Sequence, residues 1–68
     1  MSDNYVGVTA KVLCVRPKAV LLEGEGGQGW IPRSCIHAAD DSILGAVGVG
    51  DEISVRMFEW IAQKSGLI

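Results

Sequence analysis

Two stretches of the chain alternate between apolar and polar residues, a period-two pattern that predicts half-buried β-strands. The first runs over residues 5–15 and the second over residues 52–58. Pro17 ends the first strand, because proline lacks the N–H that a sheet ladder needs. The residues expected to face the core are Val6, Val8, Ala10, Val12 and Cys14 in the first stretch, and Ile53, Val55 and Met57 in the second.

The middle of the chain predicts a β-hairpin. Residues 18–23 read as a strand in which residues 19–22 are apolar on both faces, and Trp30 and Ile31 begin a short strand that Pro32 stops. The glycine-rich residues 24–29 between them predict a turn, longer than the two-residue type. A phosphate-binding loop is not expected there, because a strand follows the glycines and no Lys-Ser or Lys-Thr pair is present.

Helical structure is predicted to be short. Residues 33–37 predict one turn capped by Ser34, and residues 43–49 predict a loose loop because glycine recurs there and weakens a helix. Residues 59–66 predict a terminal helix that ends at Gly66 in the left-handed conformation. The last two residues, both apolar, would then fold back onto the helix.

Four strands and a terminal helix predict a mainly β fold, a small barrel of four to five strands in a single domain over residues 1–68, with residues 1–4 disordered. Trp60 is expected to dock the terminal helix on the core. Trp30 has two interpretations: a small core needs its largest side chains, which favours burial, but an exposed indole would be a stacking platform for a base. The chain has neither a secretory signal nor an apolar run near 18 residues, which predicts a cytoplasmic protein without a membrane.

Charge is divided unequally along the chain. Eight acidic residues against six basic ones, a net charge of -2, argue against a generic polyanion binder. However, residues 1–38 hold four bases against three acids, whereas residues 39–68 hold two bases against five acids. A local basic face in the first half is therefore predicted, although surface charges also serve solubility alone. The candidate nucleic-acid-binding residues are Lys11, Arg16, Lys18 and Arg33, with Tyr5 and Trp30 as stacking rings.

Catalytic and metal-binding motifs are not expected. Cys14 and Cys35 are interpreted as free thiols of a reducing compartment, and Cys35 with His37 lacks the Cys-x-x-Cys pair of zinc sites. No paired acid and base suggests catalysis, and 68 residues leave little room for a walled pocket. The chain is therefore predicted to be no enzyme and to need no cofactor or metal.

Three pieces of sequence together resemble the OB-fold RNA-binding domain that is repeated in the largest small-subunit ribosomal protein. They are the valine-rich first strand, Gly-Trp-Ile-Pro-Arg-Ser at residues 29–34 and Val-Gly-Asp-Glu-Ile-Ser-Val at residues 49–55. The resemblance implies an OB-like barrel that binds RNA. The chain departs from the family in ending with a helix instead of a strand and in lacking the family's exposed aromatic pair.

A second resemblance accounts better for the terminal helix and the missing aromatic pair. Residues 30–34, Trp-Ile-Pro-Arg-Ser, followed by the closing residues 59–67 look like small uncharacterised proteins of bacteriophages and mobile elements. This resemblance implies an origin and no established activity. Two hypotheses remain: a module that binds single-stranded nucleic acid, or a protein-interaction module acting as an inhibitor or adaptor on a host protein. An open sheet edge and the apolar residues 43–49, 67 and 68 further predict a homo-oligomer.

Overall fold

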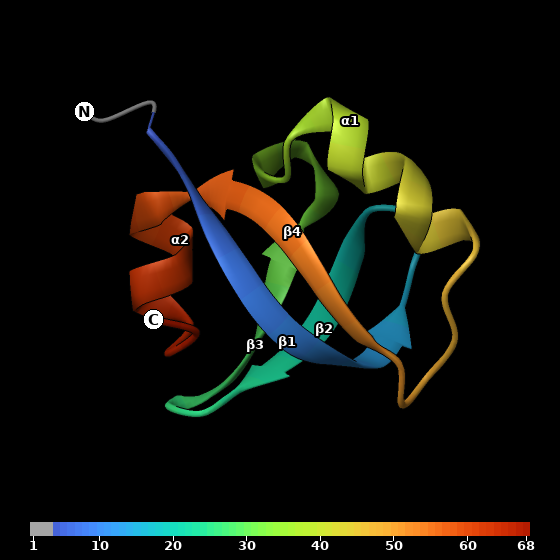
Figure 1. Cartoon of the computed structure of the whole chain (residues 1–68), viewed down its shortest axis with the longest axis horizontal. Helices are drawn as coiled ribbons and strands as arrows, with labels where there is room; N and C mark the ends of the chain where they lie inside the picture. The colour runs from blue at the N-terminus through green and yellow to red at the C-terminus, as the bar shows by residue number, and fades with distance from the viewer. Residues whose placement is uncertain (1–3) are drawn as a thin grey trace.

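In the computed structural model, residues 4–68 form one antiparallel sheet of four strands in the order β3-β2-β1-β4, with short helices at its margins (Figure 1). The mainly β class is therefore confirmed. In the described part of the chain β3 and β4 are the two edges and do not pair with each other, so the sheet is open and the predicted closed barrel is not seen. The elements are β1 (Tyr5–Val15), β2 (Ala19–Gly24), β3 (Gly27–Pro32), η1 (Arg33–Cys35), α1 (Ala38–Asp41), η2 (Ser42–Gly45), β4 (Glu52–Phe58) and α2 (Glu59–Lys64).

Residues 1–3, which carry most of the predicted disordered start, lie outside the described residues. Asn4 is exposed, and its carbonyl oxygen accepts a hydrogen bond of 2.9 Å from the Glu59 N–H. The start of β1 is thus joined to the start of α2. None of the helices in residues 4–68 has the length and apolar character needed to cross a membrane.

Strand β1 is the centre of the sheet and changes partner along its length. Its first half pairs with β4 and its second half pairs with β2. The register with β2 shifts between Val12, which opposes Leu22, and Cys14, which opposes Leu21. This β-bulge at Leu13 inserts one residue and therefore exchanges the faces of the strand beyond it. The prediction that Cys14 faces the core is wrong for this reason, since the bulge places Cys14 beside Leu21 on the outer face.

The other alternating positions are buried as the pattern predicts, except Val6, which is partly buried and packs against the core. One cluster of apolar side chains draws on both long strands, the hairpin and the short helices. Every described buried residue is apolar, so this core contains no buried charge that would need a partner. Its members are Val8, Ala10, Val12, Val20, Leu22, Ile31, Cys35, Ile36, Leu44, Ile53, Val55, Met57, Ile61, Ala62 and Leu67.

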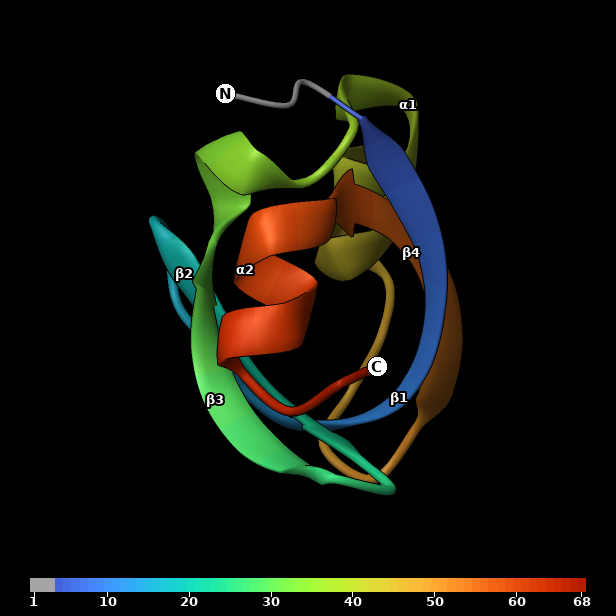
Figure 2. The same cartoon turned by 90° about the vertical axis from the view of Figure 1, so that its left-hand side faces the viewer.

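Helix α2 lies across the open side of the curled sheet, between β3 and β1 (Figure 2). It ends as predicted: Gly66 has φ 75°, and its N–H donates to the Gln63 carbonyl while the Leu67 N–H donates to the Ala62 carbonyl. These two bonds form a Schellman motif, which satisfies the last carbonyls and turns Leu67 into the core. Ile61 and Ala62 dock the helix, whereas Trp60 remains 48% exposed, so its predicted burial is wrong.

The glycine-rich hairpin is tighter than predicted. Gly24 pairs with Gly27, so only Glu25 and Gly26 form the turn and β3 begins earlier than expected. The tip packs directly on the end of α2: a Cβ added to Gly26 would lie 2.5 Å from the Gly66 carbonyl oxygen, and one added to Gly66 would lie 2.9 Å from that of Gly26. Two backbones meet here without side chains between them, which only glycine permits.

The segment between β3 and β4 contains more helix than predicted. Ser34 does not cap a turn; instead η1 follows Pro32, and His37 caps α1 by accepting the Ala39 N–H at its Nδ1 atom (3.1 Å). The expected loop over residues 43–49 begins with η2, which buries Leu44 in the core. Helices of about one turn leave too few residues for a periodic pattern to be detected.

Candidate binding face

The bulge in β1 assembles an apolar row on the outer face of the sheet. Cys14 opposes Leu21 on β2, and Leu21 opposes Trp30 on β3. The neighbouring strand positions, including Val20 and Ile31, point into the core and are fully buried. Trp30 is 48% exposed, which decides between its two interpretations: it is a surface residue and does not close the core.

A second row lies beside the first on the same face and includes the cation Arg16. The Arg16 N–H donates to the Ala19 carbonyl (2.8 Å), and Ala19 opposes Pro32 across the hairpin. Arg16 lies two positions beyond Cys14 and thus shares its face. We call the two rows together the Trp30 face, which comprises Cys14, Leu21, Trp30, Arg16, Ala19 and Pro32.

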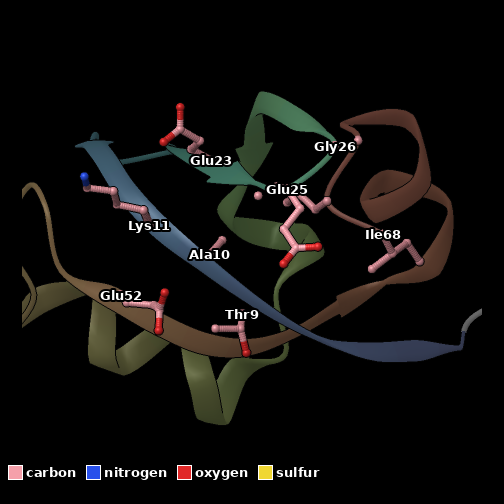
Figure 3. Close-up of a pocket in the computed structure, with 11 residues that line it drawn as sticks. Thr9, Ala10, Lys11, Glu23, Glu25, Gly26, Glu52 and Ile68 are labelled. Atoms are coloured by element: carbon pink, nitrogen blue, oxygen red, sulfur yellow. The ribbon is translucent and has the colours of Figure 1, made fainter.

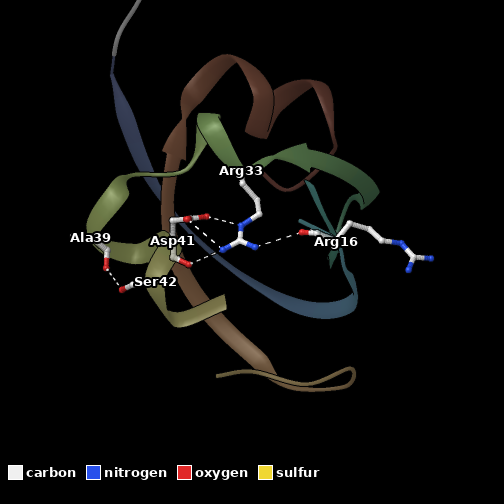
Figure 4. Close-up of polar contacts among 5 residues, drawn as sticks. All are labelled: Arg16, Arg33, Ala39, Asp41 and Ser42. Carbon is white, nitrogen blue, oxygen red and sulfur yellow. Dashed lines mark hydrogen bonds and ion pairs between the residues drawn. The ribbon is translucent and has the colours of Figure 1, made fainter. Parts of the chain in front are cut away.

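Two of the predicted cations lie in the β1–β2 turn, at the end of the Trp30 face to which Arg16 belongs. Arg16 and Lys18 flank Pro17, and both are exposed. The Arg16 side chain extends away from the body of the protein (Figure 4). Because proline restricts the backbone of this turn, the two cations are presented from a stiff base.

Arg33, a third predicted cation, is engaged within the chain. Its Nε donates to Asp41 Oδ1 at 2.9 Å, its Nη2 donates to Oδ2 at 3.3 Å, and its Nη1 donates to the Arg16 carbonyl at 3.4 Å (Figure 4). The hydrogen bond to Asp41 raises the pKa of Arg33 above its ordinary value. The backbone N–H of Arg33 also donates to the Lys18 carbonyl. Arg33 therefore ties the β1–β2 turn to α1 and holds Arg16 and Lys18 in position.

Lys11 lies in acidic surroundings. It opposes Glu23 on β2 and Glu52 on β4, so each of its cross-strand neighbours is a carboxylate. With Glu25 these residues surround an open pocket of about 730 Å³ (Figure 3). We call this the acidic pocket; it is lined by Thr9, Ala10, Lys11, Glu23, Gly24, Glu25, Gly26, Glu52, Gly66, Leu67 and Ile68. The predicted basic face is consequently not continuous, because the carboxylates of Glu23 and Glu52 flank Lys11, whereas Arg16 and Lys18 lie in the β1–β2 turn.

Tyr5 lies at the opposite end of β1 from the Trp30 face. Its ring stacks on Phe58 with centroids 4.8 Å apart and meets the His37 ring edge-on at 5.0 Å. Of the six predicted site residues, Arg16 and Lys18 therefore share the β1–β2 turn, to which Arg33 is hydrogen-bonded, and Trp30 lies on β3 on the face that Arg16 shares. Tyr5 and Lys11 lie elsewhere.

A second bidentate ion pair, which was not predicted, joins Arg56 and Asp40. The Arg56 Nε lies 2.8 Å from Asp40 Oδ2, which also accepts the Arg56 backbone N–H at 2.8 Å. The side-chain hydrogen bond from Arg56, followed by the backbone one, lowers the pKa of Asp40 to about 2. Nothing in the sequence indicates this pair, because its members are sixteen residues apart and belong to different elements.

The chain was compared with protein-family models, curated proteins and solved structures, and none of them matches it. Within residues 4–68 there is also no group of three or more His, Cys, Asp or Glu side chains able to hold a metal ion.

Proposed function

We propose that this protein is a small non-enzymatic module that binds single-stranded nucleic acid on the Trp30 face. The observation that carries the proposal is a half-exposed Trp30 on the same sheet face as Arg16, with Leu21 between β1 and β3. An exposed indole stacks on any base, and base–aromatic stacking contributes about 1–3 kcal/mol per base. Arg16 and Lys18 supply the cations that a phosphate backbone requires.

The strand order supports an OB-like interpretation of the fold. β1 pairs with both β2 and the last strand, and helical segments connect β3 to β4. An OB-fold is a partly open barrel of five strands that binds oligonucleotides on its second and third strands and on the loop between the first and second. In this proposal α2 occupies the place of the fifth strand, and the Trp30 face coincides with the surface used for binding. Arg33 acts as a positioning residue, whereas Lys11 and Tyr5 lie outside the contact.

The decisive experiment compares the two exposed tryptophans. Fluorescence anisotropy with labelled single-stranded DNA and RNA should show binding at about 50 mM salt that weakens as salt is raised. Trp30→Ala should lower the affinity about five- to hundredfold, the equivalent of one stacked base. Trp60→Ala is the matched control, because both tryptophans are 48% exposed, and it should leave the affinity unchanged.

The salt dependence tests the cations separately. Two phosphate contacts on a single strand predict a slope of log K against log salt of about −1.4, and Arg16→Ala should reduce it to about −0.7. Lys64→Ala removes an exposed cation from α2 and should not alter the slope. Undetectable binding at about 50 mM salt, or binding that ignores salt, would refute the nucleic-acid proposal.

A second candidate function is a protein-interaction module, as an inhibitor or adaptor of the phage or mobile-element origin that the second resemblance implies. The acidic pocket favours it, because three glutamates around an open hollow complement a basic partner. Capture of one stoichiometric protein from a lysate, lost in Glu23→Gln with Glu25→Gln and retained in Trp30→Ala, would support this alternative.

A further inference from the structure

Strand β3 presents an unpaired edge. The Arg33 N–H donates to the Lys18 carbonyl, which fixes the phase of the ladder between β2 and β3. Hydrogen-bonded and non-hydrogen-bonded pairs alternate in an antiparallel ladder, so the residues bonded to β2 are Arg33, Ile31, Gly29 and Gly27. Gln28 and Trp30 direct their N–H and C=O groups away from β2. Within residues 4–68 no hydrogen bond to another segment reaches these groups.

The other edge of the sheet is occupied near its end. Ile36 forms a bridge with Met57, and the His37 N–H donates to the Arg56 carbonyl at 2.8 Å. The Arg56 N–H is in turn bonded by the Asp40 carboxylate. The two edges therefore differ: β4 is covered by side chains and by a neighbouring segment, whereas β3 is open. An open edge is a template for another strand.

We infer that two copies of this chain associate by antiparallel pairing of their β3 edges. With Gly29 opposite its own copy, Gln28 of each chain opposes Trp30 of the other. These two pairs would exchange four backbone hydrogen bonds, and Gly29 would occupy the close, non-hydrogen-bonded position between them. The two sheets would then join, with both Trp30 faces on the same side.

Charge favours a second copy in this orientation. The hairpin has a basic end, with Arg16, Lys18 and Arg33, and an acidic end, with Glu23 and Glu25. Antiparallel pairing about Gly29 places Glu25 of one chain opposite Arg33 of the other, so the acidic end of each hairpin meets the basic end of its partner. A parallel arrangement would bring like charges together. Complementary potentials of this kind fix register and orientation.

The inference does not depend on nucleic-acid binding, and it revises the predicted oligomer contact. Residues 43–49 and the last two residues are not one exposed apolar patch, because Leu44 and Leu67 lie in the core. The residues that form the inferred contact are instead exposed strand positions at Gln28 and Trp30.

Sedimentation equilibrium tests the inference with the full chain. The mass should rise with concentration from 7.2 kDa to twice that value. Gln28→Pro removes an N–H that β2 does not use, so it should keep cooperative unfolding and remain monomeric. A wild-type chain that stays monomeric at millimolar concentration, or a folded Gln28→Pro variant that dimerises like the wild type, would overturn the inference.

A pair of charge reversals decides the matter if Gln28→Pro does not fold. Glu25→Arg should weaken the dimer about three- to tenfold, because it places an arginine opposite Arg33. Glu52→Arg makes the same change in net charge away from β3 and should have no effect; equal effects of both would count against the β3 edge. Hydrogen exchange adds a direct readout: the Gln28 and Trp30 amides should become protected only as the concentration rises, and their unchanged exchange in a dimer would exclude this interface.

Discussion

The two ends of the β2–β3 hairpin hold neighbouring segments in different ways. At the basic end, Arg33 reaches Asp41 and the Arg16 carbonyl through side-chain hydrogen bonds, and the side chains of the ion pair are 24% and 32% exposed. At the tip, Gly26 meets Gly66 backbone to backbone. The basic end is therefore held by a partly exposed ion pair, whereas the tip is held by close backbone packing that two glycines allow.

Because of this difference, the two ends of the hairpin should respond differently to substitution. Exposed ion pairs contribute little net stability and are screened by salt, so the basic end can change without loss of the fold. The contact between the Gly26 and Gly66 backbones has no room for a methyl group. Adding one would force the backbone to shift, which destabilises the fold. We therefore expect changes at the tip to alter stability and changes at the basic end to alter binding.

The largest effect is expected from Gly66→Ala. The residue has φ 75°, where a side chain costs about 1–2 kcal/mol, and its new Cβ would press on the Gly26 backbone. A loss of about 2–4 kcal/mol is comparable with the total stability of about 3–5 kcal/mol expected for so small a domain. Urea denaturation followed by circular dichroism should show a large fall in midpoint. Gly45→Ala is the control, because nothing lies within 4 Å of its added Cβ; equal midpoints for both variants would contradict the close contact.

A smaller effect is expected from Arg33→Ala. The change frees the β1–β2 turn from α1, so oligonucleotide affinity should fall by less than in Trp30→Ala, while the melting temperature drops only slightly. Arg33→Lys keeps the charge and loses the bidentate geometry, and it should recover only part of the affinity. Asp41→Asn should reproduce the loss, and the double variant should be no weaker than either single one. Additive losses would show that Arg33 contacts the ligand directly.

The smallest effect is expected in the stability at acidic pH, through the ion pair of Asp40 with Arg56. The pKa of Asp40 falls from 3.8 to about 2 in the folded chain, so the ionised carboxylate is favoured by folding. Its contribution is complete above the unfolded value and is lost as the pH falls through about 2. The melting temperature of Asp40→Asn should therefore approach that of the wild type as the pH is lowered from 6 toward 2, and Arg56→Ala should behave alike. A constant difference across this range would show that the ion pair is not what stabilises this edge.

The two cations of the β1–β2 turn could be predicted from local sequence. Arg16 and Lys18 flank a proline between two strands, which places them in an exposed turn whatever the rest of the chain does. The exposure of Trp30 could not be predicted in this way, because a tryptophan in a short strand is compatible with either the buried or the exposed face of the sheet. The engagement of Arg33 by Asp41 was equally hidden, since ion pairs between separate elements leave no periodic pattern.

Local periodicity is enough to specify the long strands and the terminal helix, and the backbone freedom of Gly66 specifies where that helix ends. Contacts between elements far apart in the sequence set the bulge at Leu13, the outward position of Cys14 and Trp30, and the partners of Arg33. A strand's alternation states which residues share a face, but a one-residue register shift exchanges the faces. The shift is set by the neighbouring strands, which the local pattern does not contain.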